Sequence, residues 1–204
     1  MGKARLGSQN VRTYQPPPET LAHFHALPWC RPTLYDPDFR PYDMSRTVSD
    51  NGLGHTLMGK TWNTDDTVRE VLSFYKAPTS TSRGEIRRFY TFGNGLNAHP
   101  SFLHGGVIAT ILDSTLGNVI KQGREDKIQG PAYTAQLNVA YKSPVKTPGT
   151  IMSQGWIMSQ GWIKSIEAGG RKIWVEGVVS SEVDGKVVIH ANVESLWLVG
   201  KSKL

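Results

Sequence analysis

"HGGVIATILDSTLGNVI", residues 104–120, is the one long helical pattern in this sequence. At about 100° per residue, its larger apolar side chains fall within a single sector about 100° wide. This sector holds Ile108, Ile111, Leu112, Thr115 and Val119. We therefore expect one long helix with a buried stripe that packs against a hydrophobic core.

A second face of the same helix carries small residues and one carboxylate. Gly106, Ala109, Thr110, Asp113 and Gly117 fall on a roughly opposite sector. Asp is a poor helix former in a helix interior, so its presence needs a reason. Because small neighbours let a ligand or another backbone come close, this pattern favours a functional carboxylate over a solvated surface Asp.

The start of the helix has the features of an oxygen-binding site. Free N–H groups and the positive end of the helix dipole gather there, and Gly105 and Gly106 expose them beside His104. Gly106 and Asp113 are, however, separated by about 10 Å of helical rise. One carbonyl cannot reach both groups, whereas two antiparallel helices can bring them together. We therefore predict a symmetric dimer with two composite sites.

The rest of the chain predicts an α+β domain in which this helix packs on an antiparallel sheet. Alternating and β-branched patterns predict strands, and a short amphipathic pattern predicts a helix at 19–29. The expected strands are 67–77, 85–92, 133–145, 150–166, 171–183 and 186–199, the last four as a meander. Residues 1–18 are expected to be a disordered tail, 19–199 the domain, and 200–204 an exposed tail.

One strand segment contains a duplication. IMSQGW occurs at 151–156 and again at 157–162. Side chains alternate with period two in a strand, so a shift of six residues keeps every residue on its face. The extra copy lengthens the strand by about 20 Å, beyond what its neighbours can pair with. We expect a projecting hairpin or a looped-out copy without a catalytic role.

Composition and charge exclude several classes of protein. The net charge of +6 is scattered, which argues against nucleic-acid binding, and no apolar run is long enough to span a membrane. The single cysteine, Cys30, fits a reducing compartment. The last residues, Ser202-Lys203-Leu204, match a peroxisomal address read by an import receptor. We predict a peroxisomal protein in a eukaryotic host, and otherwise a cytoplasmic one.

Several stretches together resemble one known family. GLNAHPSFLHGGVIATILDSTLG (95–117), YTAQLNVAYKSPVKTPG (133–149) and GRKIWVEG (170–177) are similar to hotdog-fold thioesterases of the phenylacetyl-CoA-thioesterase-like branch, in its form common in filamentous fungi. LPWCRP (27–32) and DPDF (36–39) also fit. The resemblance covers roughly residues 20–199. It implies an antiparallel sheet wrapped around one helix, a homodimer or dimer of dimers, and hydrolysis of acyl thioesters, usually acyl-CoA, without metal or cofactor.

The resemblance also implies roles for individual residues. Asp113 would be the general base or the nucleophile, and Thr134 would place a hydroxyl near it. The Gly106 N–H, helped by His104 and Gly105, would hold the thioester carbonyl. Independently of the resemblance, further candidates for substrate binding are His99, Arg171 and Lys172. For the last two, contact with the CoA phosphates and a solvated turn both stay open.

Other functions are less well supported. The sequence has no G-x-S-x-G nucleophile elbow of an α/β-hydrolase. Hotdog hydratases carry a His five residues after the Asp, where this chain has Asn118. No acidic or Cys cluster completes a metal site with His99 and His104. The rival that stays open is a non-catalytic hotdog protein that binds acyl thioesters or assists a secondary-metabolite (polyketide) pathway. The acyl group, and CoA against a carrier domain, also stay open.

Overall fold

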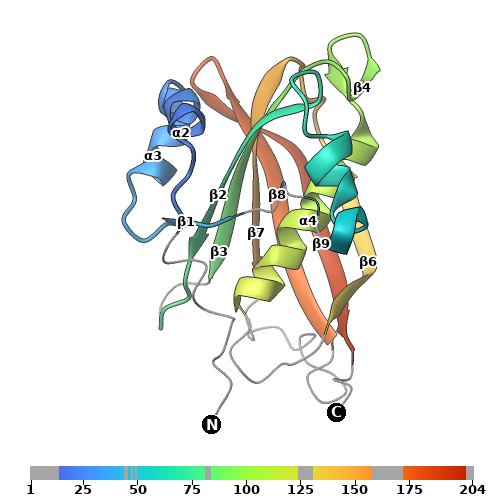
Figure 1. Ribbon diagram of the computed structural model, residues 1–204. Coiled ribbons are helices and arrows are strands. Elements are labelled where there is room, and N and C mark those ends of the chain that lie inside the picture. The colour runs from blue at the N-terminus through green and yellow to red at the C-terminus, as the bar shows by residue number, and fades with distance from the viewer. Residues whose placement is uncertain are drawn as a thin grey trace.

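A curved antiparallel sheet wraps around one long helix (Figure 1). The computed structural model describes residues 14–43, 46, 48, 50–80, 84–123, 131–157 and 172–200. The seven-stranded sheet has the order β1-β2-β3-β7-β8-β9-β6. Its strands are β1 (Arg40–Pro41), β2 (Val68–Lys76), β3 (Glu85–Phe92), β6 (Ala132–Tyr141), β7 (Gly149–Ile157), β8 (Lys172–Val183) and β9 (Lys186–Val199). The expected α+β arrangement is confirmed.

The remaining elements are short, apart from the central helix α4 (Gly105–Gly123). Helices α2 (Pro18–His25), η1 (Pro28–Cys30) and α3 (Arg31–Leu34) precede the sheet, and η2 (Asp50–Gly52) and η3 (Leu57–Thr61) follow β1. A two-stranded sheet of β4 (Asn97–His99) and β5 (Phe102–Leu103) leads into α4. No helix within the described residues is long and apolar enough to cross a membrane.

The buried stripe of α4 lies against the concave face of the sheet. Ile108, Ile111, Leu112, Thr115 and Val119 are all buried, as the sequence pattern predicts. Two strand glycines let the helix approach closely. A Cβ on Gly155 of β7 would lie 2.9 Å from the Leu116 and Val119 side chains, and one on Gly177 of β8 would lie 3.1 Å from Leu116. The small residues of the sheet therefore set the position of α4.

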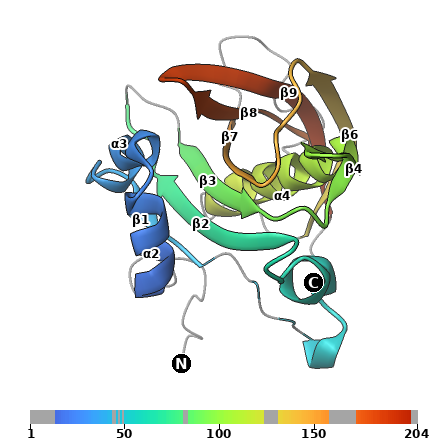
Figure 2. The ribbon, with the colours of Figure 1, turned by 90° about the horizontal axis from the view of Figure 1, so that it is seen from above.

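The two faces of the sheet have different partners (Figure 2). Along β3, Ile86, Tyr90 and Phe92 belong to the core around α4, whereas Phe89 packs with Phe24 and the α2–α3 region on the convex face. This alternation is the period-two pattern of a strand. It also directs Arg88, which lies between Ile86 and Tyr90 in this alternation, toward α4.

The expected four-strand meander is wrong in one respect. Strands β7, β8 and β9 are consecutive neighbours, but β6 pairs with β9, with Leu137 opposite Ser195. Strand β7 pairs on its other side with β3, where Arg88 faces Ser153. Hydrophobic alternation specifies the face of a strand and not its neighbour, so the sequence pattern could not distinguish these pairings.

Several element limits also differ from expectation. The first helix begins at Pro18 and ends at His25, and a separate 3-10 turn begins at Pro28. The Pro-rich stretch 29–41, whose composition predicts irregular structure, contains α3 and most of η1. His23 is half-buried and lies 2.7 Å from the Thr91 hydroxyl. Residues 1–13 and 201–204 lie outside the described residues, so the tails and the domain limits stay predictions.

The first copy of the duplicated hexapeptide lies in β7 with the predicted facing. Ile151, Ser153 and Gly155 are buried toward α4, and the Ser153 and Thr115 hydroxyls lie 2.9 Å apart. On the opposite face, the Trp156 indole donates to Glu176. The second copy, from Met158 onward, lies outside the described residues. The predicted hairpin or looped-out copy therefore stays a prediction.

We expect Gly155→Ala to lower the free energy of unfolding by about 1–3 kcal/mol, because the new methyl group collides with the underside of α4. Urea denaturation followed by circular dichroism measures this change. Gly161→Ala, the same substitution in the second copy, is the matched control and should have a smaller effect. An equal or larger loss for Gly161→Ala would mean that the second copy takes the register observed here for the first.

Candidate active site

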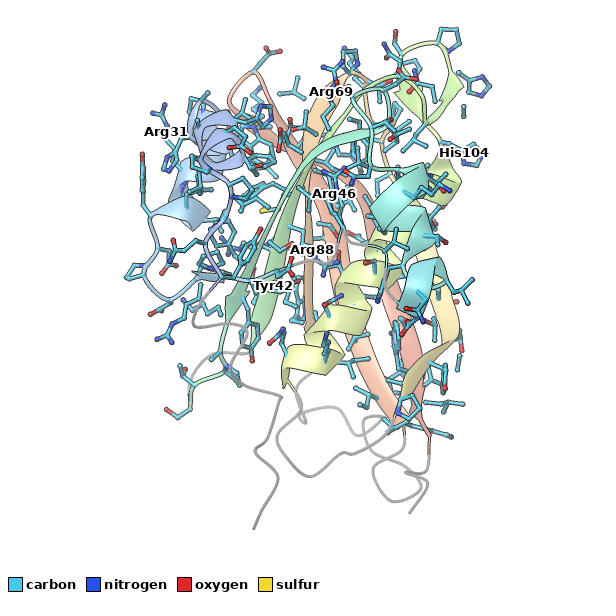
Figure 3. The ribbon with its side chains drawn as sticks, viewed as in Figure 1. Arg31, Tyr42, Arg46, Arg69, Arg88 and His104 are labelled. Carbon is cyan, nitrogen blue, oxygen red and sulfur yellow. The ribbon has the colours of Figure 1, made fainter. Side chains whose placement is uncertain are left out.

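The imidazole of His104 caps the start of α4. The Gly106 N–H donates to His104 Nδ1 at 2.8 Å, and the Val107 N–H donates to the His104 carbonyl at 3.0 Å. His104 and Gly106 are exposed at this end of the helix (Figure 3). The Gly106 donor is therefore engaged in the free chain. A substrate carbonyl would have to displace the imidazole to use it.

Gly105 is held by a side chain from the edge strand. The Tyr141 hydroxyl donates to the Gly105 carbonyl at 2.8 Å, and a Cβ on Gly105 would lie 3.4 Å from the Tyr141 ring. This contact fixes the end of β6 to the first turn of α4. The orientation of the glycine amides therefore depends on β6 as well as on the helix itself.

The carboxylate of Asp113 and the hydroxyl of Thr134 lie together. Thr134 Oγ1 donates to Asp113 Oδ1 at 2.6 Å, a length typical of a bond to a charged acceptor. Asp113 is half-buried on α4, and Thr134 is exposed on β6, where Trp197 of β9 is its partner. The structure thus brings together two of the sequence-predicted residues. One oxygen of the carboxylate is fixed by this contact.

The two halves of the predicted site are separate within one chain. Gly106 begins α4 and Asp113 lies near its middle, about 10 Å further along the helix axis. Between them, Ala109 and Thr110 are half-exposed, which leaves a small-residue surface on this side of α4. Gly117 does not extend that surface, because a Cβ there would lie 2.9 Å from the Trp197 ring. Trp197 therefore covers the helix where the sequence predicted an open face.

The remaining predicted residues are dispersed. His99 is exposed in β4, ahead of the helix start. Lys172 is the first residue of β8 and pairs with Leu198 of β9. Leu198 directly follows Trp197, which is the partner of Thr134. It thus lies toward the Thr134 end of the sheet and is not brought to His104. Arg171 lies outside the described residues.

A buried arginine that the sequence reading missed lies beside this site. Arg88 is completely buried, with Nε donating to the Tyr42 hydroxyl at 2.9 Å and Nη1 donating to Ser114 Oγ at 3.0 Å. Burial lowers the pKa of Arg88, but Tyr42 and Tyr90 together raise it by more than burial lowers it. The net shift is therefore upward. Burial raises the pKa of Tyr42, while Arg88 opposes that shift. The alternation of EIRRFYTF could have revealed Arg88, since it places this residue on the inward face with Ile86 and Tyr90.

Cys30 and His190 are two further residues of reactive types, and both lie outside the predicted site. Burial, with a smaller contribution from the charge of Glu182, raises the pKa of Cys30 to about 12, so Cys30 is a neutral packing residue. His190 Nε2 lies 2.8 Å from the Ser181 hydroxyl, and burial lowers the pKa of His190. Among the described residues, no three His, Cys, Asp or Glu side chains gather into a possible metal site.

Comparison with known proteins relates this site to one superfamily. Residues 101–162 match the model of the thioesterase superfamily. The matched segment contains His104, Asp113 and Thr134. It also contains the helix α4 and the first copy of the duplicated hexapeptide.

Individual relatives carry the same description. The chain is 35% identical over 106 residues to the acyl-coenzyme A thioesterase THEM4 of Mus musculus, a match that covers 51% of this chain and 40% of that protein. It is 32% identical over 119 residues to THEM4 of Rattus norvegicus, covering 57% and 45%. The match therefore spans less than half the length of these relatives. Among solved structures, zebrafish thioesterase superfamily member 2 is 17% identical, covering 64% of this chain and 81% of that one, with a TM-score of 0.48.

We expect His104→Ala to lower the free energy of unfolding by about 1 kcal/mol, because the helix loses its capping acceptor. His104→Asn should retain most of the stability, since Asn is a good N-cap residue whose side-chain oxygen accepts the same kind of bond. Thermal unfolding of the three proteins side by side measures the difference. Equal losses in the two variants would show that the imidazole stabilises the chain by packing and not by capping.

Proposed function

We propose that this protein hydrolyses acyl thioesters, with acyl-CoA as the substrate class. The observation that carries the proposal is the Asp113 carboxylate held at 2.6 Å by the Thr134 hydroxyl, beside small residues on an accessible side of α4. The match of this segment to the thioesterase superfamily, and its similarity to two proteins named acyl-coenzyme A thioesterases, support the same conclusion.

In this proposal, Asp113 acts as a general base. Thr134 occupies Oδ1, which leaves Oδ2 as the atom that accepts a proton from a water molecule. The resulting hydroxide attacks the thioester carbonyl carbon, the C–S bond breaks, and the thiolate takes up the proton from Asp113. The products are the free acid and the thiol. Direct attack by Asp113 is the covalent alternative that remains open.

The developing negative charge on the carbonyl oxygen requires donors. The Gly106 N–H at the start of α4 supplies one when the carbonyl replaces the His104 imidazole, and the helix dipole adds to its effect. Because Gly106 and Asp113 are too far apart on one helix, we propose that the donor comes from a second copy of the chain. The site would then be composite, and the protein a symmetric homodimer or a dimer of dimers.

Three attributes go beyond what the comparisons support and stay predictions. These are the phenylacetyl-CoA-thioesterase-like branch, the identity of the acyl group, and the peroxisomal location with its import receptor. Residues 202–204, which carry the address, lie outside the described residues.

We expect Asp113→Asn to lower kcat/KM for acyl-CoA hydrolysis by at least about a hundredfold, because the amide cannot accept the proton of water. Thr134→Val should lower it by about tenfold, since the carboxylate loses its positioning hydrogen bond. Release of free thiol from a series of acyl-CoA substrates, followed with a thiol reagent, measures both changes.

The matched control is Asp184→Asn, which removes a carboxylate from the exposed turn between β8 and β9 and should leave activity unchanged. Equal thiol release by wild type and Asp113→Asn would remove Asp113 from the mechanism. Binding of acyl-CoA without thiol release by the wild type would favour the non-catalytic acyl-thioester binder or pathway accessory protein.

The composite site predicts complementation between two inactive variants. Gly106→Pro removes the amide donor at a helix position where proline is tolerated, and Asp113→Asn removes the base. In a mixed dimer, one site carries both defects and the other carries neither. After subunit exchange at equal concentrations, about a quarter of the sites, and so of the activity, should return.

The two variants measured separately are the control, and both should stay inactive after the same exchange procedure. Light scattering gives the mass of each species. A mixture that forms dimers but recovers no activity would mean that Gly106 and Asp113 act within one chain.

A further inference from the structure

One peptide group at the start of α4 carries the amide that the proposed mechanism uses. The carbonyl of Gly105 and the N–H of Gly106 belong to the same planar unit, and in a trans peptide they point in opposite directions. At the hydrogen end, the N–H donates to His104 Nδ1 at 2.8 Å. At the oxygen end, the carbonyl accepts from the Tyr141 hydroxyl at 2.8 Å. Two side chains that lie outside α4 therefore hold this peptide at both ends.

The peptide needs such restraint, because both of the residues that it joins are glycines. A residue without a Cβ reaches a wider range of φ and ψ, so the plane of a Gly-Gly peptide turns more freely than that of other pairs. When a substrate oxygen displaces the His104 imidazole, as the proposed mechanism requires, the hydrogen end loses its present partner. The bond from Tyr141 is at the other end of the peptide, so it survives this exchange and keeps the plane in place.

The sheet fixes the backbone that carries this tyrosine. Tyr141, the last residue of β6, pairs with Ala191 of β9, and the next N–H along the chain donates to the His190 carbonyl at 2.8 Å. The N–H of Leu103, just before the helix, donates to the Val145 carbonyl at 3.0 Å. The segment 141–145 thus supports both the hydroxyl and the strand that leads into α4, so the hydroxyl has a defined position relative to the first turn.

The ring of Tyr141 lies with its hydroxyl end over Gly105. A Cβ built on Gly105 would lie 3.4 Å from Cε1, 3.5 Å from Cζ and 3.6 Å from the hydroxyl oxygen of this ring. These are ordinary van der Waals distances, so the ring packs beside the glycine while its hydroxyl bonds the carbonyl. Phenylalanine at this position would keep the packing and lose the hydrogen bond.

A donor at the carbonyl also changes the other end of the peptide. Hydrogen bonds that are linked through one group polarise and strengthen one another. The Tyr141 hydroxyl draws electron density toward the Gly105 oxygen, which leaves the Gly106 N–H more positive and a stronger donor. A stronger donor gains most when its acceptor carries negative charge. The contact therefore stabilises an oxyanion more than the neutral carbonyl of the bound substrate.

We propose that Tyr141 is a positioning residue for the oxyanion donor of Gly106. This inference rests on the proposed thioesterase function and adds a residue to it. Tyr141 acts through the peptide, by holding its plane and by polarising its N–H, and this role requires no contact with the reacting atoms. Its effect belongs to the chemical step and not to substrate binding.

The kinetic test is Tyr141→Phe with acyl-CoA as the substrate. We expect kcat to fall by about threefold to tenfold, the range of one hydrogen bond between neutral groups, while KM stays within about a factor of two. Tyr133→Phe, which removes an exposed hydroxyl near the other end of β6, is the matched control and should leave kcat unchanged. An unchanged kcat in Tyr141→Phe, or an effect on KM alone, would overturn the proposal.

The amide proton of Gly106 reports on the same contact without any substrate. Its resonance is assigned in proton–nitrogen correlation spectra and should be absent in Gly106→Pro. Tyr141→Phe should move it to lower chemical shift, because the N–H becomes a weaker donor, and Tyr133→Phe should leave it in place. 3-Fluorotyrosine incorporated at position 141 has a hydroxyl that donates more strongly. While this phenol stays protonated, it should move the same proton to higher chemical shift and raise kcat.

The two readouts separate failure of the proposed function from failure of this inference. If the wild type releases no thiol from acyl-CoA, hydrolysis fails, and the proton shift alone decides whether Tyr141 acts on the peptide. An unmoved Gly106 proton in both proteins altered at position 141 would overturn the proposal, whatever the kinetics show. If Tyr141→Phe fails to fold, the fluorotyrosine protein carries the test through the opposite direction of both effects.

Discussion

The packing of α4 into the concave face of the sheet is the constraint on which the rest of the molecule depends. The helix can sit close because Gly155 and Gly177 carry no side chain where Leu116 approaches the strands. That depth determines which helix residues are buried and which stay accessible. It places Asp113 within reach of Thr134 on one side and Ser114 within reach of Arg88 on the other. The chemistry proposed for the site thus depends on how closely α4 packs against strands β7 and β8.

The sequence predicts those parts of the structure that depend on local periodicity. The helical pattern of residues 104–120 identifies the buried stripe, and the strand pattern of 151–156 identifies the faces of β7. Non-local features are harder. The pairing of β6 with β9 joins segments that are far apart along the chain, and alternation carries no information about it. The contact of Thr134 with Asp113 was anticipated from family resemblance and not from spacing.

Arg88 shows why the burial of a polar residue cannot be predicted from its residue type alone. In EIRRFYTF two adjacent arginines resemble a solvated pair, and only the period of the strand indicates that one of them turns inward. The structure separates them. Arg87 donates to Glu85 and Thr33, whereas the side chains that accept from Arg88 among the described residues are the hydroxyls of Tyr42 and Ser114. The same strand therefore has one arginine that stabilises the convex face and one that leaves positive charge beside the central helix.

This asymmetry bears on how specificity can arise in such a fold. A pocket lined only by apolar side chains separates acyl groups by size, and each methylene changes binding by a small factor. The Arg88 guanidinium does not line such a pocket, because it is enclosed between β3 and α4 and donates to Tyr42 and to Ser114. Its hydrogen bonds fix α4 against β3, so the residues that can contact a substrate are those on the accessible side of the helix, beside Asp113.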